Sequence, residues 1–246
     1  MAQISSITRV GKTEPFELQV ARGQISWHTP LFKYGYNSNI INVEETIWDV
    51  GGIYAYPSSA VAMTATSASG ATDSGVTGLI FGLDANYNEV SEAFTLDGSG
   101  TYTTTQTFLR VFRAYITGSS APAGNIAIAN GGTTYAQISA GENQTLMAVY
   151  TVPAGKSLYV NKGIAAHGTA TSGGVFMTVR FLVRNEGEVF RTAVKVDVSE
   201  SEIIYPFAQP IKIPEKSDVE VRAICNKNQA NAMSASFDGI IIEESI

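Results

Sequence analysis

Three polar side chains at alternate positions, Asp84, Asn86 and Asn88, match the first ligand positions of a calcium-binding loop. Such a loop also needs a glycine at its sixth position and a bidentate glutamate at its twelfth, where this sequence has Glu89 and Thr95. A polar turn between two strands explains the same residues, because Asp and Asn side chains accept hydrogen bonds from nearby backbone amides. The sequence therefore predicts a β-turn here and no metal site.

The two histidines and the one cysteine do not form a recognisable reactive group. No cysteine or carboxylate stands at metal-ligand spacing from His28 or His167. No serine lies in a nucleophile elbow. Cys225 has no partner for an intrachain disulfide, and we expect it to be a small residue of the core. These patterns predict no catalytic residue and no cofactor, and therefore a protein that is not an enzyme.

Four tyrosines stand in two alternating pairs, Tyr34 with Tyr36 and Tyr54 with Tyr56. Carbohydrate-binding sandwiches use exposed aromatic rings as platforms, and these four side chains have the chemistry for one. The alternative is that each pair marks one face of a strand, because side chains two residues apart point to the same side. The sequence leaves both interpretations open.

The composition is that of a packed, weakly charged protein. Apolar residues make up 44% of the 246 residues, which is enough for a hydrophobic core. Charged residues make up only 15%, below the usual ~25%. Either the surface is rich in Ser, Thr, Asn and Gly, or neighbours in an assembly cover much of it. The net charge of −6, with no basic stripe, argues against a nucleic-acid partner.

No stretch of the sequence has the pattern of a signal peptide or a membrane span. Residues 1–6 contain neither a basic start nor an apolar run. Residues 50–72 carry no charge, but Gly51, Gly52 and Pro57 interrupt a span that would need ~20 mainly apolar residues. We therefore expect no membrane partner. A single cysteine fits synthesis in a reducing cytoplasm.

Alternating apolar residues predict the strands of an antiparallel sheet. In residues 176–184 every second side chain is apolar, Val179 and Phe181 among them, and residues 190–198 repeat the pattern. Such alternation is typical of a sheet with one solvated face. Turn signals at ~8–12-residue spacing predict an all-β, antiparallel β-sandwich that is jelly-roll-like, with roughly fourteen short strands. At most one short helix is expected, over about residues 40–48, where Val, Ile and Thr also allow a strand.

The first 39 residues differ from the rest of the chain, because their apolar residues follow neither a helical nor a sustained strand period. Residues 1–39 are therefore either an extended N-terminal arm or the first strands of the core, and residues 40–246 form the sandwich domain. In the arm interpretation, aromatic side chains anchor on a partner, since aromatic residues are enriched at interfaces. The predicted interface residues are Phe16, Trp27, Phe32, Tyr34 and Tyr36.

Five segments of the chain resemble the virion structural proteins of marine tailed bacteriophages. They are residues 45–54 (ETIWDVGGIY), 82–92 (GLDANYNEVSE), 108–111 (FLRV), 150–156 (YTVPAGK) and 214–223 (PEKSDVEVRA). Each segment alone is a turn and a strand, whereas together they make a specific set. The resemblance extends from the first of these segments to residue 243 and leaves the N-terminal 39 residues outside it.

This resemblance implies a component of a virus particle, with no active-site residue to carry over. The expected role is that of a capsid decoration or cement protein, which docks on the major capsid protein and stabilises the shell. The alternative is a tail, adaptor or fibre-associated virion protein that binds glycans, and a soluble carbohydrate-processing enzyme is a third class. We expect a homo-oligomer, with a trimer inferred from the habit of jelly-roll virion proteins, made in the host cytoplasm and located in the virion.

Overall fold

The computed structural model describes residues 8–9, 12–168, 174–199 and 202–244 of the chain. Within these ranges, strands make up nearly all of the regular structure. Every pairing between them is antiparallel. The predicted all-β antiparallel sandwich is confirmed.

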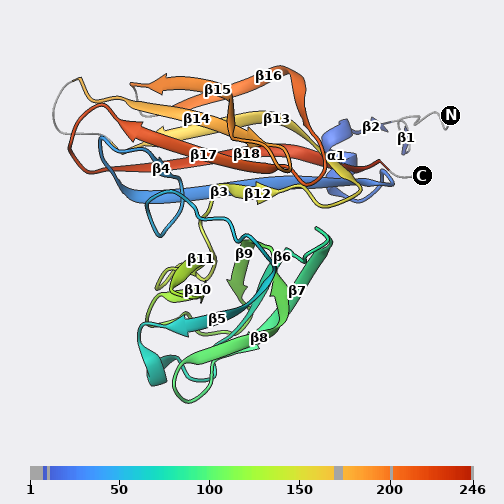
Figure 1. Cartoon of the computed structure of the whole chain (residues 1–246). Coiled ribbons are helices and arrows are strands. Elements are labelled where there is room, and N and C mark those ends of the chain that lie inside the picture. The colour runs from blue at the N-terminus through green and yellow to red at the C-terminus, as the bar shows by residue number, and fades with distance from the viewer. Residues whose placement is uncertain (1–7, 10–11, 169–173, 200–201, 245–246) are drawn as a thin grey trace.

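Two facing sheets form the larger unit, which we call the sandwich (Figure 1). One sheet has the strand order β16-β13-β18-β3, and the other has the order β12-β17-β14-β15, with β4 paired to β17. The strands of the first sheet are β3 (His28–Ile40), β13 (Lys156–His167), β16 (Glu202–Ile213) and β18 (Asn231–Glu243). Those of the second are β4 (Glu45–Thr46), β12 (Val149–Thr151), β14 (Met177–Arg184), β15 (Arg191–Val198) and β17 (Asp218–Cys225).

The core of the sandwich lies between these two sheets. Val179 and Phe181 of β14 are buried, as their alternation predicted. Phe181 packs edge-on against Phe237 of β18, with the ring centroids 5.4 Å apart. Cys225 is buried in the same apolar cluster, which confirms its expected place in the core. Removal of these side chains from water is the main force that holds the two sheets together.

A smaller unit, which we call the insert, is formed by the chain between β4 and β12 (Figure 1). Its two sheets have the orders β11-β10-β5-β8 and β7-β6-β9, and they enclose a core of their own that includes Met63, Ile80 and Phe108. The elements are β5 (Val61–Ser67), the 3₁₀ helix η1 (Gly70–Asp73), β6 (Thr77–Leu83), β7 (Glu89–Thr95), β8 (Thr101–Phe108), β9 (Arg110–Ile116), β10 (Ile126–Asn130) and β11 (Thr133–Ile138). Residues 40–246 thus contain two packed units, which the sequence patterns did not separate.

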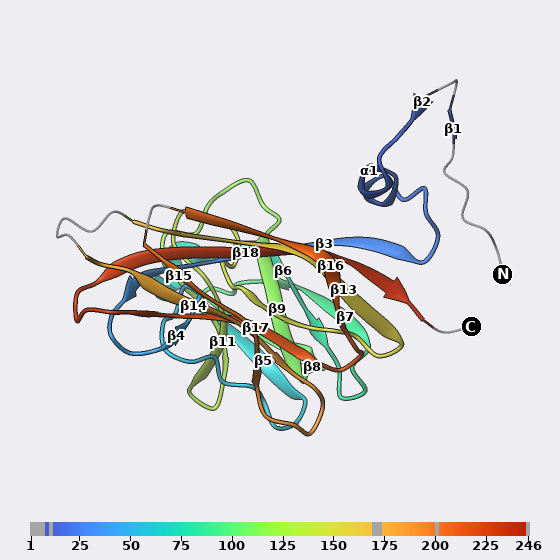
Figure 2. The same cartoon turned by 90° about the horizontal axis from the view of Figure 1, so that it is seen from above.

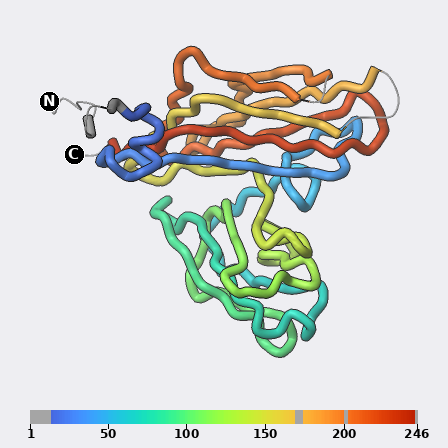
Figure 3. Tube along the Cα trace, turned by 180° about the vertical axis from the view of Figure 1, so that it is seen from behind, coloured from blue at the N-terminus to red at the C-terminus, as the bar shows by residue number. Residues whose placement is uncertain are grey.

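The insert lies along the edge of the sandwich where β3 and β12 are the outermost strands (Figure 1 and Figure 3). Strand β9 makes two polar contacts with the sandwich that hold this arrangement. Arg110 forms a buried ion pair with Asp218 of β17, and the carbonyl of Phe112 accepts a hydrogen bond from Lys33 of β3. The opposite edge, formed by β15 and β16, is not covered by the insert.

The N-terminal segment divides into two parts. Its last residues form β3, which pairs with β18 inside the first sheet. Of the residues before β3, those that the structure describes, 8–9 and 12–27, project beyond the end of the sandwich (Figure 2). Val20 and Ile25 of this projecting part pack against Ile240 of β18, which attaches it to the sandwich. Its elements are β1 (Thr8–Arg9), β2 (Lys12–Thr13) and the helix α1 (Phe16–Ala21).

Two local predictions are wrong. No helix forms over residues 40–48; the alternative, a strand, is present at Glu45–Thr46 (β4), after which Ile47 enters the core of the sandwich and Trp48 the core of the insert. The strand suggested by the alternating tyrosines is absent around Tyr54. Its backbone N–H donates to the hydroxyl of Thr46 instead of to a neighbouring strand.

Candidate interaction surfaces

Three of the predicted interface residues share the outward face of β3. Phe32 and Tyr34 are 64% and 39% exposed, and Tyr36 is half-buried. Lys33 and Gly35 point to the opposite face and are buried, as the period of two in a strand requires. The cross-strand partners of the three aromatic residues on β18 are Asp238, Ser236 and Ser234. Because these partners are small or polar, they leave the aromatic rings largely uncovered.

The other two predicted interface residues lie where β3 begins. Phe16 of α1 is 42% exposed, and its ring contacts that of His28 at a centroid distance of 5.8 Å. Trp27, directly before β3, is 57% exposed. His28 and Phe32 lie on the same face, because the pairing of β3 with β18 runs between them without a register shift. We define the aromatic surface as Phe16, Trp27, Phe32, Tyr34 and Tyr36.

The tyrosine platform that the sequence left open is not formed. Tyr54 is buried in the core of the insert, and its hydroxyl donates to the carbonyl of Val111 at 3.0 Å. Tyr56 packs against the Tyr54 ring, with centroids 4.7 Å apart. The guanidinium carbon of Arg184 lies 4.3 Å from the centroid of the Tyr56 ring. Burial raises the pKa of the Tyr56 hydroxyl well above its usual value. These two tyrosines are structural, whereas Tyr34 remains exposed.

The residues that resemble a calcium loop form a turn between β6 and β7. One carboxylate oxygen of Asp84 accepts the backbone N–H groups of Asn86 and Asn88, at 2.8 and 2.9 Å. Desolvation opposes ionisation of this carboxyl, but the hydrogen bonds from Asn88 and Asn86 outweigh it and hold the pKa of Asp84 below its usual value. The side chain therefore serves the turn, which confirms the β-turn interpretation.

The histidines show no shared site either. His28 and His167 each bond through Nδ1 to a nearby backbone carbonyl, of Ser26 and Gly168 respectively. In the part of the chain that the structure describes, no group of three or more His, Cys, Asp or Glu side chains is placed to hold a metal ion. No helix within that part is both long and apolar enough to span a membrane.

A buried ionic cluster joins the insert to the sandwich. Arg110 donates from Nε and Nη2 to the two carboxylate oxygens of Asp218, at 2.8 and 3.1 Å. Arg184 and the hydroxyl of Thr151 donate to the same carboxylate, at 3.0 and 2.6 Å. Burial alone would lower the pKa of Arg110, but the hydrogen bond and charge of Asp218 outweigh it and raise the pKa above its usual value. Because three side chains donate to the Asp218 carboxylate, this group is not available as an acid or base. The cluster instead holds the insert against the sandwich.

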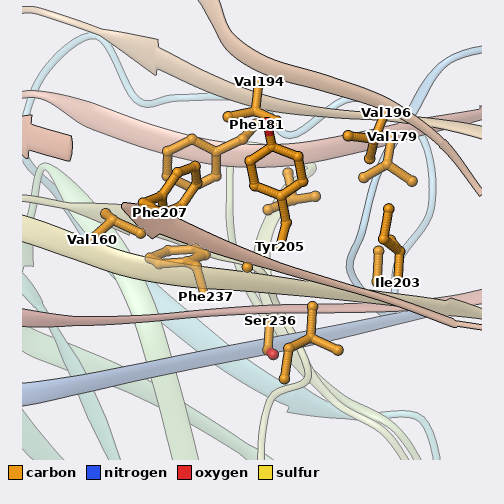
Figure 4. Close-up of a pocket in the computed structure, with 14 residues that line it drawn as sticks. Val160, Val179, Phe181, Val194, Val196, Ile203, Tyr205, Phe207, Ser236 and Phe237 are labelled. Carbon is orange, nitrogen blue, oxygen red and sulfur yellow. The ribbon is translucent and has the colours of Figure 1, made fainter. Parts of the chain in front are cut away.

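The sequence patterns did not reveal a second apolar surface, at the sandwich edge opposite the insert. Among the described residues β15 pairs only with β14, and β16 only with β13, so the interior between the sheets reaches the surface there. Tyr205 of β16 is 41% exposed and lies, with Ile203 and Phe207, across from Val194 and Val196 (Figure 4). We call these five residues the edge opening, and they line part of a cavity of about 50 Å³.

The edge opening had a signal in the sequence, because Ile203, Tyr205 and Phe207 alternate as side chains on one face of a strand do. Two prolines, Pro206 and Pro210, lie in the same strand and obscure this pattern. Proline has no N–H to donate, and it is characteristic of edge strands that must not pair with another chain. Strand β16 therefore presents its side chains, more than its backbone, at this edge.

No protein-family model and no curated protein matches the chain. Among solved structures, it has some likeness to T=1 particles derived from infectious bursal virus, with 10% identity, a TM-score of 0.27, and coverage of 89% of this chain and 70% of that chain. The VP2 subviral particle of infectious bursal disease virus gives 10% identity and a TM-score of 0.25, with coverage of 94% and 78%. The Gt strain of that virus gives 9% identity, a TM-score of 0.25 and the same coverage. TM-scores this low carry no argument about this chain.

Proposed function

We propose that this chain is a non-enzymatic structural protein of a virus particle and that the aromatic surface is its docking site for another virion protein. The observation that carries the proposal is the exposure of Phe16, Trp27 and Phe32 outside both cores, at 42%, 57% and 64%. Phe32 and Tyr34 share one face of β3 with His28, whose ring Phe16 contacts, and apolar side chains gathered on one exposed face mark interaction sites. Aromatic side chains are also the residues that most often dominate binding energy at interfaces.

The order of the strands supports the same proposal. From β12 onward the chain passes back and forth between the two sheets, and only the step from β14 to β15 stays within one sheet. Two facing sheets whose strands are linked in this manner are expected of a jelly roll, an architecture that viral capsid proteins use. Lectins and cupins use it as well, so the strand order supports a virion role only together with the aromatic surface.

The finer proposal is a decoration or cement protein of a marine tailed bacteriophage, docked on the major capsid protein as a homo-oligomer, with three subunits as the proposed number. Its support is the sequence resemblance over residues 45–243. A tail, adaptor or fibre-associated role is the alternative and would use the same surface. Of the four tyrosines on which glycan binding was argued, Tyr54 is buried and Tyr56 packs against it, which leaves Tyr34 and Tyr36 on the surface.

The test is the binding of purified protein to particles that lack it. The double variant Phe32→Ala/Tyr34→Ala should bind at least ~30-fold more weakly than the unaltered protein, because each ring of an interface hot spot contributes ≥ ~2 kcal/mol. Val189→Ala is the matched control, since Val189 is 74% exposed and lies outside the aromatic surface. Equal binding of the double variant and the unaltered protein would rule out the aromatic surface as the docking site.

The location of the bound protein separates the finer alternatives. Electron microscopy of decorated particles should show many copies over the shell if the protein is a decoration or cement protein. Density confined to one vertex would assign it to the tail or its adaptor. No density on any particle, together with turnover of a glycan by the isolated protein, would overturn the structural role itself.

A further inference from the structure

A buried lysine without a carboxylate partner lies where β3 meets the insert. Lys33 is only 7% exposed, and a lysine is almost never buried to this extent unless it is paired. Its Nζ donates to the backbone carbonyl of Phe112 at 2.5 Å and lies 5.8 Å from the centroid of the same residue's ring. An ammonium group has three donor protons, and the described residues supply one acceptor. Up to two donors are therefore left without a protein partner.

The backbone around Lys33 explains why this side chain is buried. A Cβ atom on Gly35 would lie 2.2 Å from the carbonyl oxygen of Ile47 and 2.4 Å from the backbone nitrogen of Ala148. Only glycine therefore allows β3 to approach this closely. Lys33 is two residues away on the same face of the strand, so the close approach at Gly35 holds its side chain in the joint between the units.

The space beside Lys33 is a pocket of about 160 Å³, which is large enough for a small organic acid group or several waters. Phe112 of β9 and Tyr150 of β12 form an aromatic wall, with ring centroids 5.0 Å apart. Arg113, an exposed residue, also lines the pocket. Among the described residues neither Lys33 nor Arg113 forms an ion pair with a carboxylate. Two cationic side chains and aromatic walls, with no carboxylate among the lining residues, favour an anion.

The protonation of Lys33 supports this inference. Burial, and after it the charge of Arg113, lowers the pKa of Lys33 to about 7. The other titratable groups that line the pocket are Tyr34 of β3 and Tyr150 of β12, and burial raises the pKa of the Tyr150 hydroxyl well above its usual value. A bound anion would stabilise the protonated amine, so its binding must strengthen as the pH falls through the pKa of Lys33.

We propose that this pocket is a carboxylate-binding site, in which the ammonium group of Lys33 receives a carboxylate and Arg113 supplies a second cation. The carboxylate belongs either to a free organic acid or to an aspartate or glutamate side chain of a neighbouring protein. The inference does not depend on the proposed virion role, because it rests on the charges and walls of the pocket alone.

The experiment is a titration of the full-length protein with sodium glutarate, with sodium chloride at matched ionic strength as the reference, followed by Tm. At about pH 6 glutarate should raise Tm in a saturable manner, because a ligand that binds only the folded state stabilises it. At about pH 9 the affinity should be roughly 100-fold lower, because the protonated fraction of the amine falls about tenfold for each pH unit above its pKa. Lys33→Met should abolish the saturable rise.

Two further variants keep the test decisive. Lys162→Met is the matched control, because Lys162 lies outside the pocket in an exposed pair with Asp238, and it should respond to glutarate as the unaltered protein does. Arg113→Gln changes an exposed side chain, and it should weaken glutarate binding by about tenfold, the effect of losing a hydrogen bond to a charged group. This variant remains informative if Lys33→Met does not fold.

A second titration distinguishes the two sources of the carboxylate. It uses a short peptide with blocked ends and one glutamate, and the same peptide with glutamine in its place. Binding of the glutamate peptide in preference to glutarate assigns the pocket to a protein side chain, and the reverse assigns it to a free acid. If neither probe binds near pH 6, or if Lys33→Met responds as the unaltered protein does, the proposal is overturned.

Discussion

The Nε atom of Arg110 and the Oδ1 atom of Asp218 lie 2.8 Å apart, and both side chains are more than nine-tenths buried. The two residues are far apart in sequence and come from different units, β9 of the insert and β17 of the sandwich. Their contact therefore exists only when the insert is docked. An ion pair in this position makes the arrangement of the two units sensitive to single substitutions.

Arg110→Met should destabilise the protein by about 3 kcal/mol, because removal of one partner leaves the Asp218 carboxylate buried with less compensation. The value lies at the lower end of the usual ~3–5 kcal/mol, since Arg184 still pairs with Asp218. Unfolding in urea measures the change. Arg191→Met is the control, because its pair with Glu188 is exposed and should contribute no more than ~1 kcal/mol. Similar losses in both variants would contradict a structural role for the buried pair.

Phe181→Ala should lower the free energy of unfolding by ~3–5 kcal/mol, because it removes a ring that packs on Phe237 and leaves a cavity between the two sheets. Val189→Ala, on the exposed loop before β15, should change it by less than ~0.5 kcal/mol. Both values come from denaturant unfolding followed by tryptophan fluorescence. A loss in Phe181→Ala as small as that of the control would place this ring outside the core.

The stability of the protein should depend on pH through Lys33. The pKa of this amine is about 7 in the folded protein and 10.5 in its ordinary state, so between these values the unfolded chain binds more protons than the folded chain. The free energy of unfolding must therefore rise with pH across that window and fall as the pH returns to 7. The measurement is the difference between the unaltered protein and Lys33→Met in urea, from about pH 7 to pH 10. Parallel curves for the two proteins would show that the amine is not desolvated.

Asp49 should give a second pH dependence of stability, with the opposite sign. Burial, together with the charge of Glu142, raises the pKa of Asp49 to about 6, although the N–H of Leu146 donates to it. Between its ordinary 3.8 and this value the folded chain binds more protons, so the contribution of Asp49 to stability is present below pH 3.8 and is lost as the pH rises through 6. Asp49→Asn keeps an acceptor for Leu146 and should lose this dependence. A slope between pH 4 and pH 6 that persists in the variant must come from another group.

Truncation should separate the projecting segment from β3. Removal of residues 1–26 deletes α1 but leaves β3 paired with β18, so the protein should still unfold cooperatively. Removal of residues 1–36 deletes most of an edge strand and exposes the core beneath it, so the protein should lose that cooperativity. Circular dichroism during heating compares the two. If the longer deletion unfolds as cooperatively as the shorter one, β3 contributes little to the sandwich.

The local features of this protein follow from short-range patterns in its amino-acid sequence. Alternation around Val179 and Phe181 predicted a strand with one buried face, because side-chain direction in a strand has a period of two. The turn at Asp84 followed from the short-range bonding of its side chain to the next amides. These inferences succeeded because the interactions behind them lie within a few residues of one another.

The exposure of the aromatic residues, in contrast, depends on how distant strands pack. The pairs around Tyr34 and Tyr54 look alike in the sequence, yet Tyr34 is 39% exposed on the sandwich and Tyr54 is buried in the insert. The pocket beside Lys33 and the pairing of Arg110 with Asp218 likewise require strands that are distant along the chain to meet. A local pattern shows that a strand has two faces, but long-range pairing sets the partner that covers each face. The burial of these side chains and the partners of the charged ones therefore depend on the fold.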